Sequence, residues 1–289
     1  MNVETSRQSA ADLNGQVAVV TGAAQGLGLA MAELLAKRGA SVIIADRQHE
    51  KAVDAAETFR QQGRDVSAES LDVADSADVD RFFDHVRTTY SRLDILVNNA
   101  GVGQQVGPTV ELSDEEWQRV LGVTLTGTFY CCRAACRLME RQESGCIVNI
   151  SSINGLNPAA LVAAYNVAKA GVISLTRSLA LEMAAYSVRV NAVCPGPVYT
   201  DFNRTVMAQR CESLHISEDE MVERVRGAIP LGRWGNPSDI AGAVAFLCSA
   251  DASWMTGEVV RVSGGLEGVS AAPPKRELPA KDAEDEGRR

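Results

Sequence analysis

The chain has 289 residues and an acidic formal charge of −9 at neutral pH. Nucleic acids and anionic membranes both attract basic surfaces, so this charge argues against either as a partner. No apolar run approaches the roughly 18 residues that span a bilayer, and residues 1–10 lack the hydrophobic stretch of a signal peptide. We therefore expect a cytoplasmic protein, long enough to bury a core without metal or disulfides.

Seven cysteines are present, and none forms a Cys-X-X-Cys pair. Cys131, Cys132 and Cys136 fall on one predicted helix, which leaves a metal or redox site open as one interpretation. The alternative is that they are small buried thiols, a common use of cysteine. The chain has three histidines, isolated among polar residues, so zinc-dependent chemistry is not indicated.

Residues 1–13 are polar and aperiodic, and we expect a flexible N-terminal arm there. Seven short apolar segments then alternate with helix-length amphipathic segments. The expected strands are residues 16–21, 40–46, 66–72, 93–98, 146–151, 188–194 and 259–262. This alternation predicts an α/β fold, a doubly wound parallel sheet of seven strands with helices on both faces, in a single domain at residues 14–265.

Two helix starts and two irregular segments complete the outline. Ser113 is an N-cap for a long helix running toward residue 139, and Asn236 followed by Pro237 opens a helix that reaches Cys248. Residues 201–227 are charged, amphipathic and unnecessary for the sheet, so they predict a substrate lid or, alternatively, a surface helical hairpin. Residues 266–289 have very little hydrophobic content, which predicts a disordered tail.

A glycine-rich turn, Thr-Gly-Ala-Ala-Gln-Gly-Leu-Gly at residues 21–28, follows the first predicted strand. Gly22, Gly26 and Gly28 permit positive φ and a close approach of backbone amides to a phosphate at a helix N-terminus. A glycine-rich turn alone is weak support, but its position between a strand and a helix predicts nucleotide binding. Gln25 and Leu27 of the same turn join the candidate cofactor-binding residues.

Two aspartates end the next predicted strands. Asp46 lies about 20 residues past the glycine-rich turn, where a carboxylate accepts hydrogen bonds from a ribose diol, which favours NAD. Arg47 offers compensation for a 2′-phosphate, so NADP stays possible. Asp72 is placed to accept from the adenine amino group while Val73 packs nearby; a helix N-cap role for Asp72 is compatible with this.

Tyr165 and Lys169 stand four residues apart on a predicted helix and so share one face. A nearby ammonium favours the phenolate, and Tyr165 thereby becomes a candidate general base or acid. Ser152 follows a buried strand, at the edge of the sheet where ligands bind. The spacing by itself also occurs by chance, so the catalytic interpretation depends on the nucleotide motif.

Five motifs in order resemble the short-chain dehydrogenase/reductase family over roughly residues 14–265. They are Thr-Gly-X3-Gly-X-Gly (21–28), Asn-Asn-Ala-Gly (98–101), Ser-Ser before Ile-Asn-Gly (151–155), Tyr-X3-Lys (165–169) and Pro-Gly followed by Val-Tyr-Thr (195–200). The resemblance implies a Rossmann-type fold. It also implies a homotetramer or homodimer formed through the fourth and fifth crossover helices.

The resemblance also implies individual roles. Asn98 is expected to contact the adenine-side ribose, and Val198 and Thr200 to hold the nicotinamide amide and the pyrophosphate. Lys169 is expected to bind the nicotinamide ribose, and Ser152 to hydrogen-bond the substrate oxygen.

One position departs from the family's pattern. Thr124 stands where the family carries an asparagine that holds a water between the lysine and solvent. A threonine hydroxyl is able to bond its own helix carbonyl instead. We expect Thr124 to support a weakened proton relay.

Together these residues predict an NAD(P)-dependent oxidoreductase that transfers hydride reversibly between a nicotinamide, NAD by preference, and a secondary alcohol or ketone. The expected substrate is a polyol, a sugar derivative or a hydroxysteroid. The alternatives are an NADPH-dependent 3-oxoacyl thioester reductase and a weakly catalytic nucleotide-binding scaffold. The lid and six further residues are candidate substrate contacts, besides Ser152: Gln104, Gln105, Val106, Asn154, Leu156 and Tyr199, with Phe202 at the start of the lid.

Overall fold

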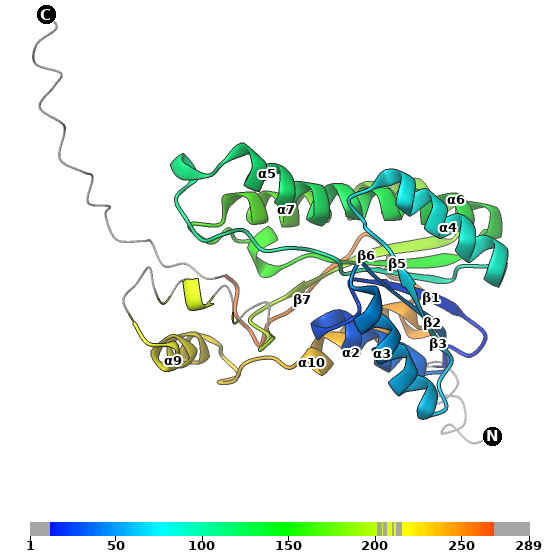
Figure 1. Ribbon diagram of the computed structural model, residues 1–289, viewed down its shortest axis with the longest axis horizontal. Helices are drawn as coiled ribbons and strands as arrows, with labels where there is room; N and C mark the ends of the chain where they lie inside the picture. Colours follow the sequence, from blue (N-terminus) through cyan, green and yellow to red (C-terminus); the bar gives the residue numbers. More distant parts are fainter. Residues whose placement is uncertain (1–11, 201–203, 205–206, 210, 212–215, 269–289) are drawn as a thin grey trace, which may run out of the picture.

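The computed structural model describes residues 12–200, 204, 207–209, 211 and 216–268. One parallel sheet, with strand order β3-β2-β1-β4-β5-β6-β7, forms its centre (Figure 1). The strands are β1 (Val17–Thr21), β2 (Ser41–Asp46), β3 (Val66–Ser70), β4 (Ile95–Asn98), β5 (Gly145–Ile150), β6 (Val188–Pro195) and β7 (Val259–Val262). The predicted single-domain, doubly wound sheet of seven strands is confirmed.

Two strands end earlier than predicted. β3 stops at Ser70 because β2, its pairing partner, ends at Asp46 opposite it, so Asp72 lies in the following loop. β5 stops at Ile150, which leaves Ser151 and Ser152 beyond the sheet. Both shifts move polar side chains to the carboxyl edge of the sheet, where a parallel sheet binds its ligands.

Helices cover both faces of the sheet. They are α2 (Gly26–Lys37), α3 (His49–Gln61), α4 (Ser76–Tyr90), α5 (Asp114–Leu121), α6 (Gly127–Gln142), α7 (Ala163–Met183), α9 (Glu218–Ala228) and α10 (Pro237–Cys248). Figure 1 shows α2, α3 and α10 on one face and α4, α6 and α7 on the other. Successive residues of a strand point to opposite faces of the sheet and pack into two apolar cores. In β1, Ala18 and Val20 belong to one core, and Val17 and Val19 belong to the other.

Both predicted helix starts are present. The Ser113 hydroxyl accepts a hydrogen bond from the Glu116 N–H at 3.2 Å, which caps α5. The Asp239 carboxylate accepts from the Asn236 N–H at 2.7 Å at the start of α10. The long helix expected from residue 113 differs in one respect, because a π-helical turn, Gly122–Thr126, lies between α5 and α6. Such turns often mark functional positions.

The domain extends slightly beyond its predicted ends. Leu13, expected in the arm, is fully buried, and its N–H donates to the Arg38 carbonyl at 2.8 Å. Leu266, expected in the tail, is 9% exposed and packs with Ile153 and Ile229. Burial of these apolar side chains joins both segments to the core. The rest of the expected arm and tail, residues 1–11 and 269–289, lies outside the described residues.

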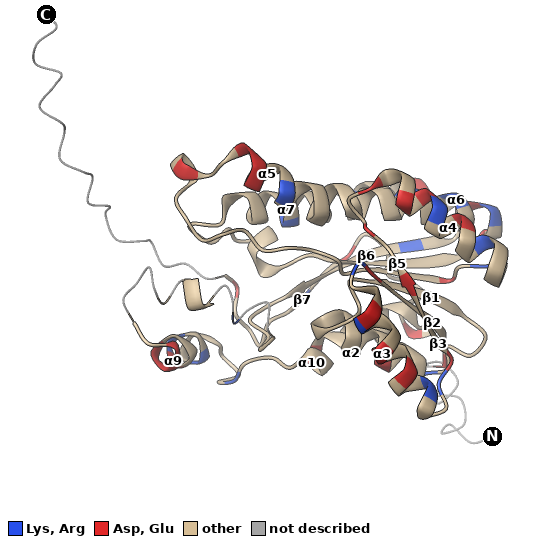
Figure 2. Cartoon of the chain, in the orientation of Figure 1, with Lys and Arg blue, Asp and Glu red and all other residues tan. Residues whose placement is uncertain are grey.

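Most of the charged residues lie on the helices, and the strands carry few of them (Figure 2). Several pair along one helix, as Glu33 does with Lys37 at 2.8 Å on α2. Exposed pairs of this kind contribute only about 0.3–0.5 kcal/mol each, so the two apolar cores dominate stability. Across the described part of the chain, we find no helix with the length and hydropathy needed to cross a bilayer.

Candidate active site

A cavity of about 590 Å³ lies along the carboxyl ends of the strands. It brings together residues that the chain places far apart, from the turn after β1 to the loop after β6. Twelve predicted site residues line it: Gly22, Gln25, Gly26, Leu27, Asp46, Asp72, Val73, Ser152, Tyr165, Lys169, Val198 and Thr200. Two predicted residues, Gly28 and Asn98, do not line it.

The glycine-rich turn forms one end of this cavity. Gly22 has a φ of +62°, and a Cβ there would lie 2.8 Å from the Ala100 Cα. Only glycine fits such a position without strain. Gln25, the N-cap of α2, makes no capping bond with its side chain, and the first turn of α2 carries no acidic residue. The first N–H groups of α2 therefore lack a side-chain acceptor, and this suits a diphosphate.

Gly28 does not line the cavity, and its lack of a side chain lets the turn pack closely. A Cβ at Gly28 would collide with the Gly22 carbonyl oxygen and with the Asn99 amide. Asn99 in turn donates from its side chain to the carbonyl oxygens of Thr21 and Gly22, at 3.0 and 2.8 Å. Close packing of α2 against the strand ends therefore requires glycine at residue 28.

Asn98 also differs from its expected role. Its side chain is 3% exposed and donates to the Asn149 side-chain oxygen at 2.9 Å, inside the protein. Asn99, Gly101 and the residues that follow line the cavity instead. Neighbouring residues of a strand point to opposite sides, so the second asparagine of the motif faces the site.

Asp46 and Asp72 lie at the same end of the cavity as the glycine-rich turn. The two carboxylate oxygens of Asp46 accept from the N–H groups of Ala24 and Gln48, at 3.0 and 2.9 Å. Asp46 thus holds the turn and also presents its charge to the cavity. Arg47 is exposed and lines the cavity beside it. Asp72 accepts from the Ala74 N–H at 2.9 Å within the loop. The alternative N-cap role for Asp72 is wrong, because Asp75 caps α4 by accepting from the Ala77 N–H at 2.8 Å.

The predicted catalytic residues meet at the centre of the cavity. The Ser152 hydroxyl accepts from the Asn154 N–H at 3.1 Å and also hydrogen-bonds Tyr165. The Lys169 ammonium lies 5.7 Å from the centre of the Tyr165 ring and donates to the Ile150 carbonyl at 2.7 Å. The helical spacing therefore places both side chains as expected.

The electrostatics of this centre differ from the prediction. Burial raises the pKa of Tyr165 to about 12, and the hydrogen bond with Ser152 offsets only part of this. Burial also lowers the pKa of Lys169 to about 8. The protein alone therefore does not depress the pKa of Tyr165, because burial outweighs the hydrogen bond with Ser152. Extra positive charge is needed to favour the phenolate.

Ser151 and Ser152 have different hydrogen-bond partners, as expected for neighbouring residues whose side chains point to opposite sides. The Ser151 hydroxyl donates to the Lys169 backbone carbonyl at 2.8 Å. This bond fastens α7 to the end of β5, while Ser152 faces Tyr165. The choice of Ser152 as the reactive serine agrees with this geometry.

Thr124 lies in the π-helical turn and is 1% exposed. Its hydroxyl accepts from the Val102 N–H at 3.2 Å and lies 3.4 Å from the Val102 carbonyl oxygen. The expected bond to its own helix carbonyl is therefore wrong. The Thr124 carbonyl instead accepts from the Thr128 hydroxyl at 2.9 Å.

Most of the expected substrate contacts lie outside the cavity wall. Of the described candidates only Tyr199 lines it, whereas Val102 and Gly103, which follow the asparagine motif, line it without having been predicted. Their position directly after Asn-Asn-Ala-Gly would have predicted that they line the cavity. Phe202 and part of the predicted lid lie outside the described residues.

Residues on either side of the predicted lid, residues 201–227, meet in one short contact. Val198 forms a parallel bridge with Gly235, and the Tyr199 ring meets Trp234 edge to face at 5.9 Å. Residues from both sides of α9 pack with Trp234 in a small cluster. The chain on both sides of the predicted lid is thus joined to the cavity wall at Tyr199.

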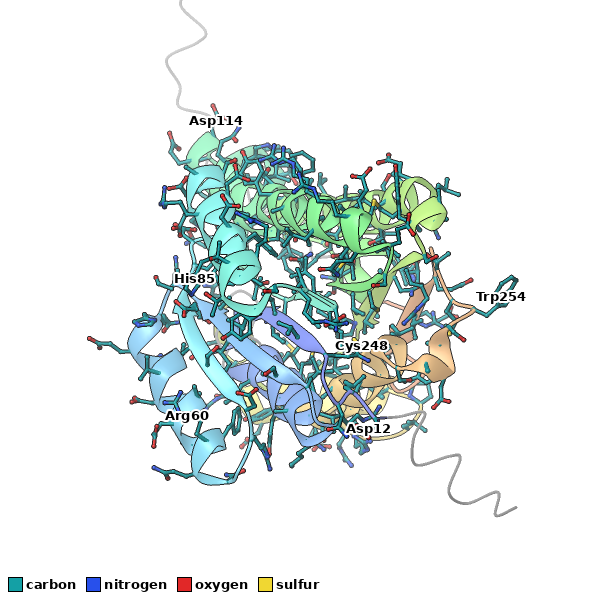
Figure 3. All side chains as sticks on the ribbon, turned by 90° about the vertical axis from the view of Figure 1, so that its right-hand side faces the viewer. Asp12, Arg60, His85, Asp114, Cys248 and Trp254 are labelled. Atoms are coloured by element: carbon teal, nitrogen blue, oxygen red, sulfur yellow. The ribbon has the colours of Figure 1, made fainter. Side chains whose placement is uncertain are left out.

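The cysteines and histidines form no second site in the part of the chain that the structure describes. All seven cysteines are free and buried, and burial raises the pKa of Cys131 to about 12. His85 projects at the surface (Figure 3) and lies 3.6 Å from Glu69. Within the described residues, no group of three or more metal-ligating side chains is assembled. The cysteine cluster is therefore part of the core.

Comparison with known proteins agrees with this geometry. The family model described as enoyl-(acyl carrier protein) reductase matches residues 22–267. A galactitol 2-dehydrogenase of Rhizobium johnstonii is 40% identical over 256 residues, covering 88% of this chain and 96% of that protein. A 3-oxoacyl-(acyl-carrier-protein) reductase of Aquifex aeolicus is 37% identical over 255 residues, covering 88% and 98%.

Solved structures agree as well. The crystal structure of a gluconate 5-dehydrogenase from Burkholderia cenocepacia, in complex with NADP and tartrate, has a TM-score of 0.84 and 31% identity, covering 90% of this chain and 98% of that one. The family match begins directly after β1 and includes strands β2 to β7. The chain is a member of the short-chain dehydrogenase/reductase family of oxidoreductases.

Proposed function

We propose that this protein transfers hydride reversibly between a nicotinamide dinucleotide, NAD by preference, and a secondary alcohol or the corresponding ketone. One observation carries the proposal. Ser152, Tyr165 and Lys169 meet in the same cavity as a helix N-terminus that is suited to a diphosphate. A dinucleotide-binding scaffold without catalysis would not require this trio of side chains.

The residues of the cavity fit the dinucleotide. The α2 N-terminus would hold the diphosphate, Asp46 the adenine-side ribose, and Val198 with Thr200 the nicotinamide end. Asp46 would repel a 2′-phosphate, which supports NAD as the preferred cofactor. Arg47 beside it provides a positive charge, so NADP remains the alternative.

The proposed catalytic residues transfer the proton and hydrogen-bond the substrate oxygen. When bound, the nicotinamide supplies the hydride chemistry and, in its oxidised form, a positive charge. Tyr165, with its pKa of about 12, holds a proton at neutral pH and can give it to the oxygen of a ketone. In the reverse direction it must take the alcohol proton, which requires added positive charge near the phenol. Ser152 hydrogen-bonds the same oxygen, and Lys169 orients the ribose.

The described wall around the reacting position favours an uncharged substrate. Val102, Gly103 and Tyr199 are uncharged, and Tyr199 is 46% exposed. We propose a polyol, a sugar derivative or a hydroxysteroid-like alcohol. Similarity to a galactitol 2-dehydrogenase supports the first of these. Similarity to a 3-oxoacyl-(acyl-carrier-protein) reductase supports the second candidate function, reduction of 3-oxoacyl thioesters with NADPH.

The lid and the oligomer remain proposals. The link of Tyr199 to Trp234 supports a lid at residues 201–227, because it joins that segment to the cavity wall. Exposed apolar side chains support a homotetramer or homodimer through α5, α6 and α7: Phe129 is 40% and Leu181 is 83% exposed. Trp254, which is 99% exposed, also projects from the surface (Figure 3).

A cofactor and substrate panel tests the proposed function. We would assay the purified protein with NAD and NADP against galactitol, gluconate and a hydroxysteroid, and with NADPH against a 3-oxoacyl thioester. The expected result is turnover of a secondary alcohol with a higher kcat/KM for NAD. Faster reduction of the thioester with NADPH would select the second candidate. Binding of NADH without turnover of any substrate would indicate a scaffold.

A further inference from the structure

A short segment, residues 103–106, joins the cavity wall to three other parts of the molecule. The Gly103 carbonyl accepts from the Arg119 guanidinium at 2.6 Å, and the Gln105 N–H donates to the Glu116 carboxylate at 2.8 Å. Both partners lie on α5, which lies beside α7 (Figure 1). The Val106 N–H donates to the Gln209 side chain in the predicted lid at 3.0 Å. This segment is therefore held firmly in place.

Gln104, within this segment, turns its side chain toward α7 and is only 4% exposed. The Gln104 side-chain oxygen accepts from the Ala164 N–H at 2.7 Å. A backbone N–H can only donate, so the oxygen of the amide must face Ala164. The Gln104 nitrogen then faces the Leu161 carbonyl oxygen at 3.5 Å, a long hydrogen bond.

The segment that Gln104 contacts needs support from outside. Leu161 has a φ of +69°, a strained value for a residue with a branched side chain. The N-cap of α7, Val162, has no side chain that can cap the helix, and the first turn of α7 carries no acidic residue. Gln104, which lies 60 residues earlier in the sequence than Ala164, thus supplies the hydrogen bond that a local cap normally provides.

The residue after the capped position is Tyr165. We propose that Gln104 is a positioning residue that fixes the start of α7 and thereby the phenol of Tyr165 against the substrate oxygen. This inference rests on the proposed function, since Tyr165 is taken as the proton donor and acceptor. Gln104 does not line the cavity, so its effect reaches the reaction only through α7.

Two substitutions separate this role from a general effect on folding. Gln104→Asn keeps the amide but shortens the side chain by one methylene, so its oxygen withdraws from Ala164. Gln104→Glu keeps the length and an acceptor, and a negative charge suits a helix N-terminus. Gln105→Asn is the matched control, because Gln105 is the adjacent glutamine, its side chain is exposed and, contrary to the sequence-based expectation, it does not line the cavity.

The experiment measures kcat, substrate KM and NADH binding for the three variants. We expect kcat of Gln104→Asn to fall about 10- to 100-fold, as small misplacements of catalytic groups do, while substrate KM and NADH binding change less than about 2-fold. Gln104→Glu should stay within about 5-fold of the wild-type kcat, and Gln105→Asn should match the wild type. A wild-type kcat in Gln104→Asn, or equal losses in Gln104→Asn and Gln104→Glu, would overturn the proposal.

Hydrogen exchange gives a second readout that does not depend on activity. Amide protection of Ala164 should fall in Gln104→Asn and persist in Gln104→Glu and Gln105→Asn. Unchanged protection of Ala164 in Gln104→Asn would show that Gln104 does not cap α7. This readout applies even if the wild type turns over none of the tested alcohols, so failure of the proposed function and failure of this inference remain distinguishable.

Discussion

The two halves of the cavity are built from different chemical groups. In the half that contains the glycine-rich turn, backbone groups form the site: a glycine with positive φ at Gly22 and the free N–H groups that begin α2. In the half that contains Tyr165 and Lys169, buried side chains form it, and burial shifts the pKa of each. The first half depends on backbone shape and on the Asp46 carboxylate, whereas the second depends on side-chain burial and on exact contacts between distant segments.

This difference explains why sequence motifs describe the first half better. A glycine turn between a strand and a helix has the same backbone geometry wherever it occurs. The reactivity of a tyrosine depends instead on how deeply it is buried and on which charges lie nearby. Substitutions in the two halves should therefore affect different measured quantities.

The largest effect should come from Tyr165→Phe, which removes the proton donor and acceptor but keeps the ring. We expect kcat to fall about 10³-fold or more, within the range that general acid–base catalysis contributes. NADH affinity should change less than about 2-fold, because the dinucleotide end is untouched. Stopped-flow turnover together with NADH fluorescence titration checks both. Substantial residual turnover would refute the role of Tyr165.

Lys169→Met should raise the free energy of unfolding at neutral pH while reducing turnover. The folded pKa of about 8 lies below the ordinary 10.5, so charging this buried lysine opposes folding. The penalty is fully present below pH 8 and disappears as pH rises through 10.5. At about 1.4 kcal/mol per pKa unit, its upper limit is about 3 kcal/mol. Urea unfolding between pH 7 and pH 10.5 should show the stability gap between variant and wild type narrowing; a constant gap would contradict the burial argument.

Asp46→Asn tests the opposite half of the cavity. Removing this carboxylate removes the repulsion of a 2′-phosphate, so the ratio of kcat/KM for NADP over NAD should rise about 10-fold. The control is Asp72→Asn, which should leave that ratio unchanged because NAD and NADP share the same adenine. Steady-state kinetics with both cofactors measure the effect. An unchanged ratio in Asp46→Asn would remove the physical basis for the proposed NAD preference.

Thr124→Asn should have the smallest effect. The Lys169 ammonium and the Thr124 hydroxyl both lie 3.6 Å from the point where a Cβ on Gly101 would sit, so they flank the same glycine. The Thr124 hydroxyl already accepts a hydrogen bond from the Val102 N–H. An asparagine amide would offer more hydrogen-bonding atoms at this position. We propose that kcat rises about 2- to 5-fold, well below the full range of proton-transfer effects. If Thr124→Asn changed neither the maximal kcat nor the pH dependence of kcat, Thr124 would have no part in a proton relay.

Sequence alone determined the order of strands and helices along the chain, the glycine-rich turn and the proposed catalytic trio. These features depend on local properties: alternation of apolar segments, the freedom of glycine, and the helical spacing that places Tyr165 beside Lys169. The strand ends were predicted to within about two residues, because pairing with a neighbour decides where a strand stops.

Tertiary structure decided everything that depends on packing between distant segments. Because of this packing, Asn99 rather than Asn98 lines the cavity. The Thr124 hydroxyl hydrogen-bonds the Val102 N–H, and Gln104 hydrogen-bonds the start of α7. The same packing also raised the pKa of Tyr165 to about 12, where the helical spacing alone had predicted a lowered one. Burial and long-range hydrogen bonds set these outcomes, and both arise only when residues far apart in the chain come into contact.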